Sequence, residues 1–136
     1  MKSCLPVLSF AFMLALLSGC QSTPDASQQP ERLSQQVART TLERAQQAYD
    51  AGDYAKAIST LKSGGVSVFD GAEPATRLAA LKLEAFSYCV NNQIAECRTQ
   101  FRKLLDVFPS FDLNVAERTH PVWGPAFEAA KKMKRG

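Results

Sequence analysis

The stretch 78–109, LAALKLEAFSYCVNNQIAECRTQFRKLLDVFP, contains two runs of apolar residues at helical spacing. The pair Asn91-Asn92 separates the runs, and Pro109 ends the second because the residue before a proline is disfavoured in helical geometry. The pattern therefore predicts two antiparallel helices joined by a short turn. Each run has one apolar face, formed by Leu81, Ala85 and Tyr88 in the first run and by Cys97, Phe101 and Leu104 in the second.

A weaker version of this pattern lies upstream, between positions 31 and 65. Gly52 supplies the left-handed residue that ends a helix, and Asp53 can cap the helix that follows. Ala57 and Leu61 occupy a small and a large position of that second helix, which Gly64-Gly65 ends. The first helix has one face that we expect to be buried, formed by Leu33, Val37, Thr41, Ala45 and Ala48.

The two predicted hairpins resemble the tetratricopeptide repeat, whose pattern combines small residues with a tyrosine, a phenylalanine and a final proline. The second hairpin follows this pattern, whereas in the first Thr41 and Ala48 replace the family's large residue and tyrosine. Gly52 and Asn92 occupy matching turns. The chain between them is longer than the family period of about 34 residues, so the connection between the two hairpins is longer than usual.

The residues that exceed the family period lie in 66–73, which we expect to form a loop. Val68 and Phe69 should tuck into the junction between the hairpins, and Asp70-Gly71 is typical of a turn. Pro74 then opens the next helix, because proline is well suited to a first helical turn.

The C-terminal residues predict one more helix after an irregular segment. Asn114 and Glu117 have the spacing of a capping pair for a short helical turn. Gly124-Pro125 should start a last helix that runs to about Lys134. The predicted fold is therefore all-α, with two tetratricopeptide-like helical hairpins plus a C-terminal capping helix. The inward face of the last helix should be Phe127, Ala130 and Met133.

The N-terminal segment, 1–19, has the composition of a secretory signal. Lys2 gives a charged start, and the apolar run 5–17 is too short to remain in a bilayer. Residues 17–20, Leu-Ser-Gly-Cys, resemble the bacterial lipobox, in which the cysteine is acylated and begins the mature chain. The resemblance implies a lipoprotein signal peptide at 1–19 and a lipid anchor at Cys20. The alternative is an ordinary signal peptide with Cys20 near its cleavage site.

The residue after the cysteine indicates which membrane holds a lipobox protein. In lipobox proteins an aspartate there favours the inner membrane, and Gln21 therefore implies the outer membrane, with the protein facing the periplasm. Residues 20–30 carry no large apolar side chain, so we expect an acylated cysteine followed by a flexible tether. The helical domain then spans 31–136.

Cys89 and Cys97 are the two cysteines left after signal removal and acylation. They flank the Asn91-Asn92 turn in an oxidising compartment, so we predict a disulfide across the turn. The alternative is two buried thiols that pack as small apolar side chains. No metal site is expected, since two sulfur ligands have no helping histidine.

Catalysis is not expected from this sequence. The one histidine, His120, stands beside Trp123 in an irregular segment, where we expect a hydrogen-bonded structural ring; a ligand or a pH switch is the alternative. The acidic residues are scattered, which disfavours a glycosidase pair. Positive charge is concentrated in residues 131–135, which argues against a nucleic-acid-binding face. We therefore predict no catalytic residue, cofactor or small-molecule substrate.

Protein binding is the predicted function. Stacked hairpins leave a concave face formed mainly by their first helices, and these carry exposed polar residues. Trp123 could also contact a partner, although we favour the interpretation that it seals the end of the repeat stack with Phe111, Leu113 and Phe127. The predicted partner-binding residues are Arg39, Glu43, Arg77, Lys82, Glu84 and Trp123.

Residues 89–131 also resemble the small lipoproteins associated with type VI secretion, the TssQ-like group. The resemblance rests on the two cysteines around a short turn, on FPSFDL at 108–113 and on THPVWGPAF at 119–127. It implies an accessory lipoprotein near the membrane complex of the secretion system. The alternatives are a pilotin-like or assembly-factor lipoprotein of another envelope complex, a self-associating structural lipoprotein, and an envelope enzyme or cell-wall ligand module.

Overall fold

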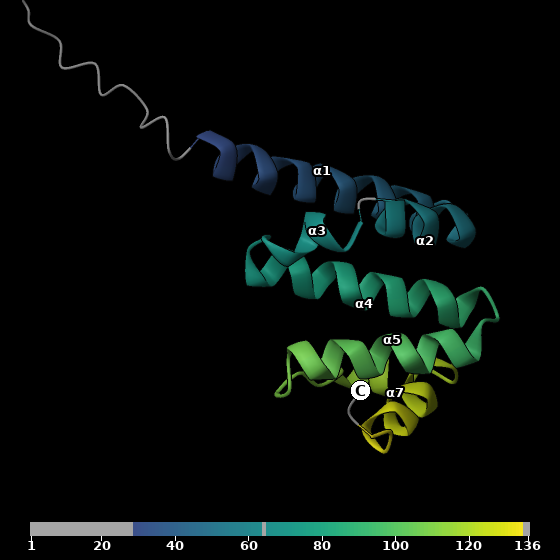
Figure 1. Ribbon diagram of the computed structural model, residues 1–136. Coiled ribbons are helices and arrows are strands. Elements are labelled where there is room, and N and C mark those ends of the chain that lie inside the picture. Colours follow the sequence, from purple (N-terminus) through teal and green to yellow (C-terminus); the bar gives the residue numbers. More distant parts are fainter. Residues whose placement is uncertain (1–28, 64, 135–136) are drawn as a thin grey trace, which may run out of the picture.

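The structure, a computed structural model, describes residues 29–63 and 65–134 (Figure 1). Within these ranges all regular secondary structure is helical, as the sequence predicts. The predicted signal peptide, Cys20 and the tether up to residue 28 lie outside the described residues. The helices are α1 (Gln29–Asp50), α2 (Tyr54–Ser63), α3 (Gly65–Asp70), α4 (Pro74–Val90), α5 (Ile94–Val107), α6 (Val115–Arg118) and α7 (Trp123–Lys131).

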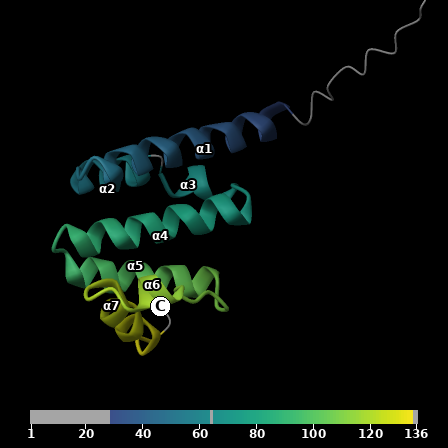
Figure 2. The ribbon, with the colours of Figure 1, turned by 180° about the vertical axis from the view of Figure 1, so that it is seen from behind.

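The long helices form two antiparallel hairpins, one stacked on the other. α1 contacts α2 and α4 contacts α5, and Figures 1 and 2 show these pairs as successive layers. α4 connects the layers, because it packs against α1 and α2 as well as against α5. α7 packs against α5, with α6 beside it. In the described part of the chain, no helix is long and apolar enough to span a membrane.

The two hairpins turn in the same way. Gly52 and Asn92 both adopt a left-handed conformation, with φ of 78° and 60°. In each turn the following residue donates its amide to a carbonyl near the end of the first helix: Asp53 to Ala48 and Gln93 to Tyr88, both at 2.9 Å. This pattern ends a helix by satisfying its last carbonyls. The two turns therefore correspond in conformation, as their matching positions in the sequence predict.

Small residues lie in the core at corresponding places of the two hairpins. Ala45 and Ala85, on the first helices, are fully buried, as are Ala57 and Cys97 on the second helices. Side chains of this size allow the helices to approach closely, and interiors are packed tightly enough that larger groups would force them apart. The members of each pair are separated along the chain by the same number of residues as Gly52 and Asn92. Two further pairs of buried residues have this separation, Ala48 with Tyr88 and Leu61 with Phe101.

An aromatic cluster joins α7 to the second hairpin. Phe101 and Phe127 are fully buried, and their rings meet edge to face with centroids 5.2 Å apart. Phe86 meets the Phe101 ring in the same manner at 5.9 Å. Burying one such side chain contributes about 1.5–3 kcal/mol, so this cluster is a main source of stability. Phe127 and Ala130 face inward, as predicted.

The predicted capping pair is present at the start of α6. The Asn114 side chain accepts a hydrogen bond from the Glu117 amide at 2.9 Å, and the Glu117 carboxylate accepts one from the Asn114 amide at 3.1 Å. Asp53 likewise caps α2, because its carboxylate accepts a hydrogen bond from the Lys56 amide at 3.0 Å. Polar side chains thus define where these two helices begin.

The predicted loop at 66–73 is wrong in part, because residues 65–70 form the short helix α3. Phe69 on this helix packs against the cluster of Ala45, Leu61, Ala80 and Leu83. A helical turn pairs backbone groups within the segment while Phe69 is partly buried, which explains why helix is preferred here. The expected turn follows at Gly71, where the Ala72 amide donates to the Phe69 carbonyl at 3.2 Å.

The predicted burial of Leu33 and Val37 is wrong. Their side chains are 61% and 44% exposed, although they share a face with the buried Ala45 and Ala48. The reason is the unequal length of the paired helices: α1 has 22 residues and α2 has 10. At about 1.5 Å per residue, α2 reaches along less than half of α1. The N-terminal half of α1 therefore keeps an uncovered apolar stripe.

The last helix also differs from the prediction at both ends. It begins at Trp123, just before the expected start, and it ends at Lys131, short of Lys134. Met133 lies beyond this end and is 39% exposed, so its predicted inward orientation is wrong. The amides of Lys132 and Met133 form shorter-range hydrogen bonds to the carbonyls of Ala129 and Ala130, which tightens the chain as the helix ends.

Candidate functional site

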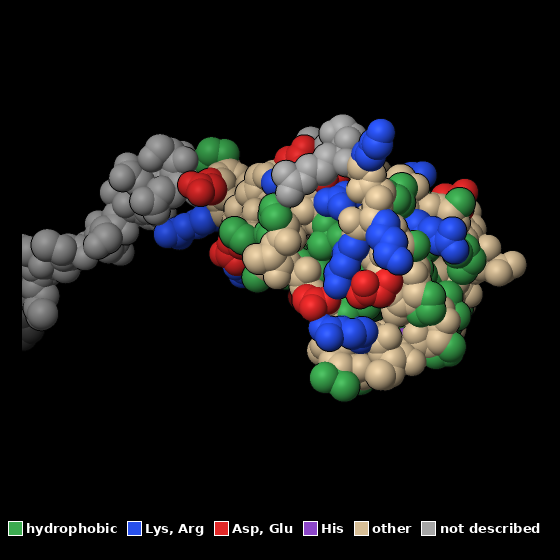
Figure 3. All heavy atoms as spheres, turned by 90° about the horizontal axis from the view of Figure 1, so that it is seen from below, with side chains coloured by type: hydrophobic (Ala, Val, Ile, Leu, Met, Phe, Trp, Pro, Cys, Tyr) green, Lys and Arg blue, Asp and Glu red, His purple; other side chains and the backbone are tan. Residues whose placement is uncertain are grey.

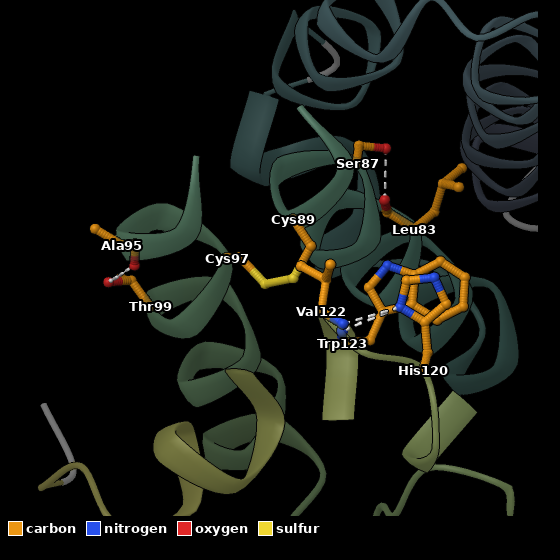
Figure 4. The surroundings of a disulfide bond; sticks show 9 residues. All are labelled: Leu83, Ser87, Cys89, Ala95, Cys97, Thr99, His120, Val122 and Trp123. Atoms are coloured by element: carbon orange, nitrogen blue, oxygen red, sulfur yellow. Dashed lines mark hydrogen bonds between the residues drawn. A yellow bond between two sulfur atoms is a disulfide. The ribbon is translucent and has the colours of Figure 1, made fainter. Parts of the chain in front are cut away.

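A disulfide joins Cys89 near the end of α4 to Cys97 in the first turn of α5, with Cα atoms 5.0 Å apart (Figure 4). The structure thus shows the pairing that the sequence predicts. Both residues are buried, at 2% and 0% exposure. Such burial suits a structural bond that fixes the two helices at their turn, and it places the sulfur atoms away from any site on the surface.

His120 holds the start of α7. Its Nδ1 atom accepts hydrogen bonds from the backbone amides of Val122 and Trp123, at 3.2 and 3.3 Å (Figure 4). Because Nδ1 is an acceptor here, a neutral ring carries its proton on Nε2. This arrangement agrees with the structural interpretation of His120, since the imidazole supplies the acceptor that the first amides of a helix otherwise lack.

Trp123 is the middle ring of a stack. Its indole lies 3.7 Å from the His120 ring and 4.2 Å from the Phe86 ring, nearly parallel to both. The indole Nε1 is buried and has no hydrogen-bond partner among the described residues. Two ring faces are therefore occupied within the protein, and contact of Trp123 with a partner stays a prediction.

Arg39 and Glu43 lie on an open polar groove along α1. The Arg39 guanidinium donates two hydrogen bonds to the Glu73 carboxylate, at 2.8 and 2.9 Å. Gln35 adds two more links between α1 and the start of α4, because it donates to the Gly71 carbonyl and accepts from the Glu73 amide. These contacts lie in the first-helix region where the sequence predicts partner binding, and they also hold the hairpins together.

The other predicted residues are divided between two places. Lys82 forms an ion pair with Glu117 of α6, and its ammonium lies 5.3 Å from the Phe86 ring centre. Arg77 and Glu84, in contrast, line a cavity of about 190 Å³ bounded by α2, α3, α4 and α5. The structure thus brings Arg77 and Glu84 to one site and places Lys82 at another.

The cavity has an apolar lining and a charged rim. Arg77 at the rim is paired with Asp70 of α3, with a nitrogen to oxygen distance of 3.2 Å. The rim also carries Lys62 from α2 and Lys103 from α5. The lining residues include no serine, cysteine or histidine. The apolar lining consists of Leu61, Phe69, Ala80, Leu81 and Val107.

Glu84 is a partly buried charged residue of the cavity lining. Burial raises the pKa of its carboxyl, while the nearby charges of Lys103 and Lys62 and a hydrogen bond from Tyr88 oppose the rise. The carboxylate also accepts a hydrogen bond from the Gln100 side chain at 2.8 Å. These partners hold Glu84 in place on α4.

Sequence reasoning missed Lys62, Phe69 and Lys103, which come from three separate helices. The available signal was on α4, where Arg77, Leu81 and Glu84 recur at helical spacing and mark one helix face. In the described residues, no group of three or more His, Cys, Asp or Glu side chains is placed to hold a metal ion.

Comparison with protein-family models, curated proteins and solved structures gives no match.

Proposed function

We propose that this chain is a lipid-anchored, tetratricopeptide-like lipoprotein that binds other proteins on the periplasmic face of the outer membrane. In this proposal it is an accessory of the type VI secretion system, as its resemblance to the TssQ-like group implies. The helical domain supplies the binding surface, and the acylated Cys20 supplies the membrane attachment.

The internal correspondence of the two hairpins carries the proposal. One offset along the chain relates the left-handed turn residues Gly52 and Asn92 and also the buried small residues Ala45 and Ala85. Repeats of this kind stack against their neighbours and present extended surfaces, which many repeat proteins use to bind other proteins. The repeat of this chain is longer than the tetratricopeptide repeat because α3 lies in the connection between the hairpins.

The C-terminal segment supports the same interpretation. A repeat stack must cover its last apolar face, and terminal elements commonly do so. Here Phe127 is fully buried and Leu113 is 2% exposed, and both belong to the core cluster of the second hairpin. We therefore assign α7, with the segment before it, the role of a capping element.

One observation favours a second candidate function, self-association. Leu33 and Val37 form an exposed apolar stripe on the N-terminal half of α1, where α2 does not reach. Two copies held on the same membrane could cover these stripes against each other. Sedimentation of the unacylated Cys20→Ala chain separates the candidates: a dimer that persists on dilution favours self-association, and a monomer favours binding to a different protein.

Site-specific photo-crosslinking in intact cells tests the main proposal. A photoreactive amino acid is placed in the full-length lipoprotein at Gln36, on the polar groove of α1, and the adducts are identified by mass spectrometry. The proposal predicts one dominant adduct with an envelope protein. The same label at Lys56, on an exposed part of α2, is the matched control. Labelling that yields no specific adduct, or only adducts between copies of this chain, contradicts the proposal.

A further inference from the structure

The cavity between the hairpins has the size of one side chain. Its volume is about 190 Å³. Sites for drug-sized small molecules usually measure about 300–1,000 Å³, so this cavity is too small for most such ligands. A single leucine, methionine or phenylalanine side chain is of the right order of size. The apolar lining suits such a side chain, because it would exchange water for contact with Leu61, Phe69 and Leu81.

The rim of the cavity specifies the charge of its occupant. Lys62 and Lys103 approach from opposite walls, α2 and α5. Among the described residues, neither ammonium group forms an ion pair with a carboxylate, although both act at a distance on Glu84. Arg77 adds a third cation, which Asp70 neutralises. Figure 3, which views the molecule from below, shows Lys and Arg side chains on this face with Asp and Glu side chains and apolar patches among them.

Glu84 is one of two acidic residues that line the cavity; burial raises the pKa of its carboxyl, and the charges of Lys103 and Lys62 oppose the rise. Its burial favours the neutral form of the carboxyl, and one of its oxygen atoms, Oε2, accepts a hydrogen bond from the Gln100 side chain. Lys62 and Lys103 form no ion pair with a carboxylate among the described residues, so an acidic group that approaches the rim can pair with them. Complementary charges at a rim steer a partner and select against partners of the wrong sign.

Two segments of this chain are poor candidates for the occupant. Residues 21–28, QSTPDASQ, contain no large apolar side chain that could fill the cavity. The exposed stripe of Leu33 and Val37 on α1 has large apolar side chains, but its flanking residues include Arg32 and Arg39. A second copy that inserted this stripe would bring these cations toward Lys62 and Lys103. The charge pattern therefore favours a different protein.

We propose, building on the protein-binding function above, that this cavity receives one bulky apolar side chain of a partner segment, with acidic residues beside it. The apolar side chain fills the space between α2 and α5, and the acidic residues pair with Lys62 and Lys103. This places one binding site where α2, α3 and α5 meet α4, apart from the polar groove along α1.

A charge-reversal experiment tests this proposal. The full-length acylated protein in lipid nanodiscs is used to select from a phage library of random heptapeptides. We expect enriched peptides to combine Leu, Phe, Met or Trp with Asp or Glu, with acidic flanks preferred over basic ones by about tenfold. The variant K62E/K103E should reverse the preference to Lys and Arg flanks. The matched control K56E/R98E changes the same charges on the same two helices outside the cavity and should keep the acidic preference.

A second variant tests the apolar part of the site. Val107→Trp places a large ring at the cavity from the end of α5 and should abolish peptide enrichment. Thermal unfolding followed by circular dichroism checks that each variant remains folded. Failure to enrich any peptides, or the same charge preference in the wild type and K62E/K103E, overturns the inference. Photo-crosslinking from α1 in cells does not use this cavity, so it can succeed while the inference fails.

Discussion

Reduction of the Cys89–Cys97 disulfide should weaken the fold by a definite amount without unfolding it. The two cysteines have a sequence separation of 8. In the chain-entropy model, closing a loop of this length restricts the unfolded chain by an amount worth about 2.5 kcal/mol. A domain of this size usually has about 5–15 kcal/mol of unfolding free energy, so the reduced protein should stay folded.

Urea unfolding followed by circular dichroism measures this change. With a urea dependence of about 1–3 kcal/mol per molar, the loss corresponds to a midpoint lowered by roughly 1–2.5 M. The comparison is between the oxidised protein and the same protein in a phosphine reductant. The control is Cys89→Ala/Cys97→Ala, whose midpoint should lie near that of the reduced wild type and should not respond to reductant.

Two results would refute this reasoning. An unchanged midpoint in reductant, or two reactive thiols in the denatured protein made in the periplasm, would mean that the bond does not form. Complete loss of the cooperative transition on reduction would mean that the apolar core does not hold the hairpin by itself, contrary to the full burial of Phe101 and Leu104.

Three further predictions concern the core, the cavity and the anchor. Phe101→Ala should cost about 3–5 kcal/mol in urea unfolding because the ring is fully buried; Phe111→Ala, at a half-buried ring, should cost clearly less, and equal losses would contradict the core described here. For Glu84, the raised pKa of the folded state means that stability falls as pH rises from the ordinary value of 4.5 through the folded value. Glu84→Gln should therefore gain stability relative to the wild type over that interval, and a constant difference across it would show that burial does not shift the carboxyl. Cys20→Ala should move the protein from the membrane to the soluble periplasmic fraction, and continued sedimentation with membranes would exclude acylation as the anchor.

The helices and turns could be predicted because local chemistry determines them. Gly52 and Asn92 mark the turns through their tolerance of left-handed geometry, and Pro74 and Pro109 mark a helix start and a helix end. The disulfide could be predicted since a tight turn brings its two cysteines together. These features depend on residues close in sequence, where the chain offers few alternatives.

The predictions fail where distant parts of the chain decide the outcome. The spacing of apolar residues along α1 identifies a face that includes Leu33. The length of α2 decides how much of that face is covered. The sequence predicts a loop in place of α3 because so short a segment shows little periodicity, and its helix is supported by Phe69 packing on the first hairpin. Met133 follows the helical period, yet α7 ends before it.

The candidate site was the least predictable feature. Two of its residues, Arg77 and Glu84, are predicted to bind a partner because of their position on a first helix, but the structure places them in a cavity that α2, α3 and α5 also line. Lys62 and Lys103 are distant in the sequence, and they come to the same cavity because α2 and α5 both pack against α4. The pattern of residues in one sequence does not reveal that α2, α4 and α5 pack around one cavity.

We propose that this chain is a lipoprotein that holds another protein at the membrane. Native mass spectrometry of gently solubilised cell membranes tests it most directly. The account predicts a complex in which one acylated copy of this chain is joined to a different envelope protein in fixed stoichiometry. Detection of this chain only as a monomer or as assemblies of itself would contradict the account.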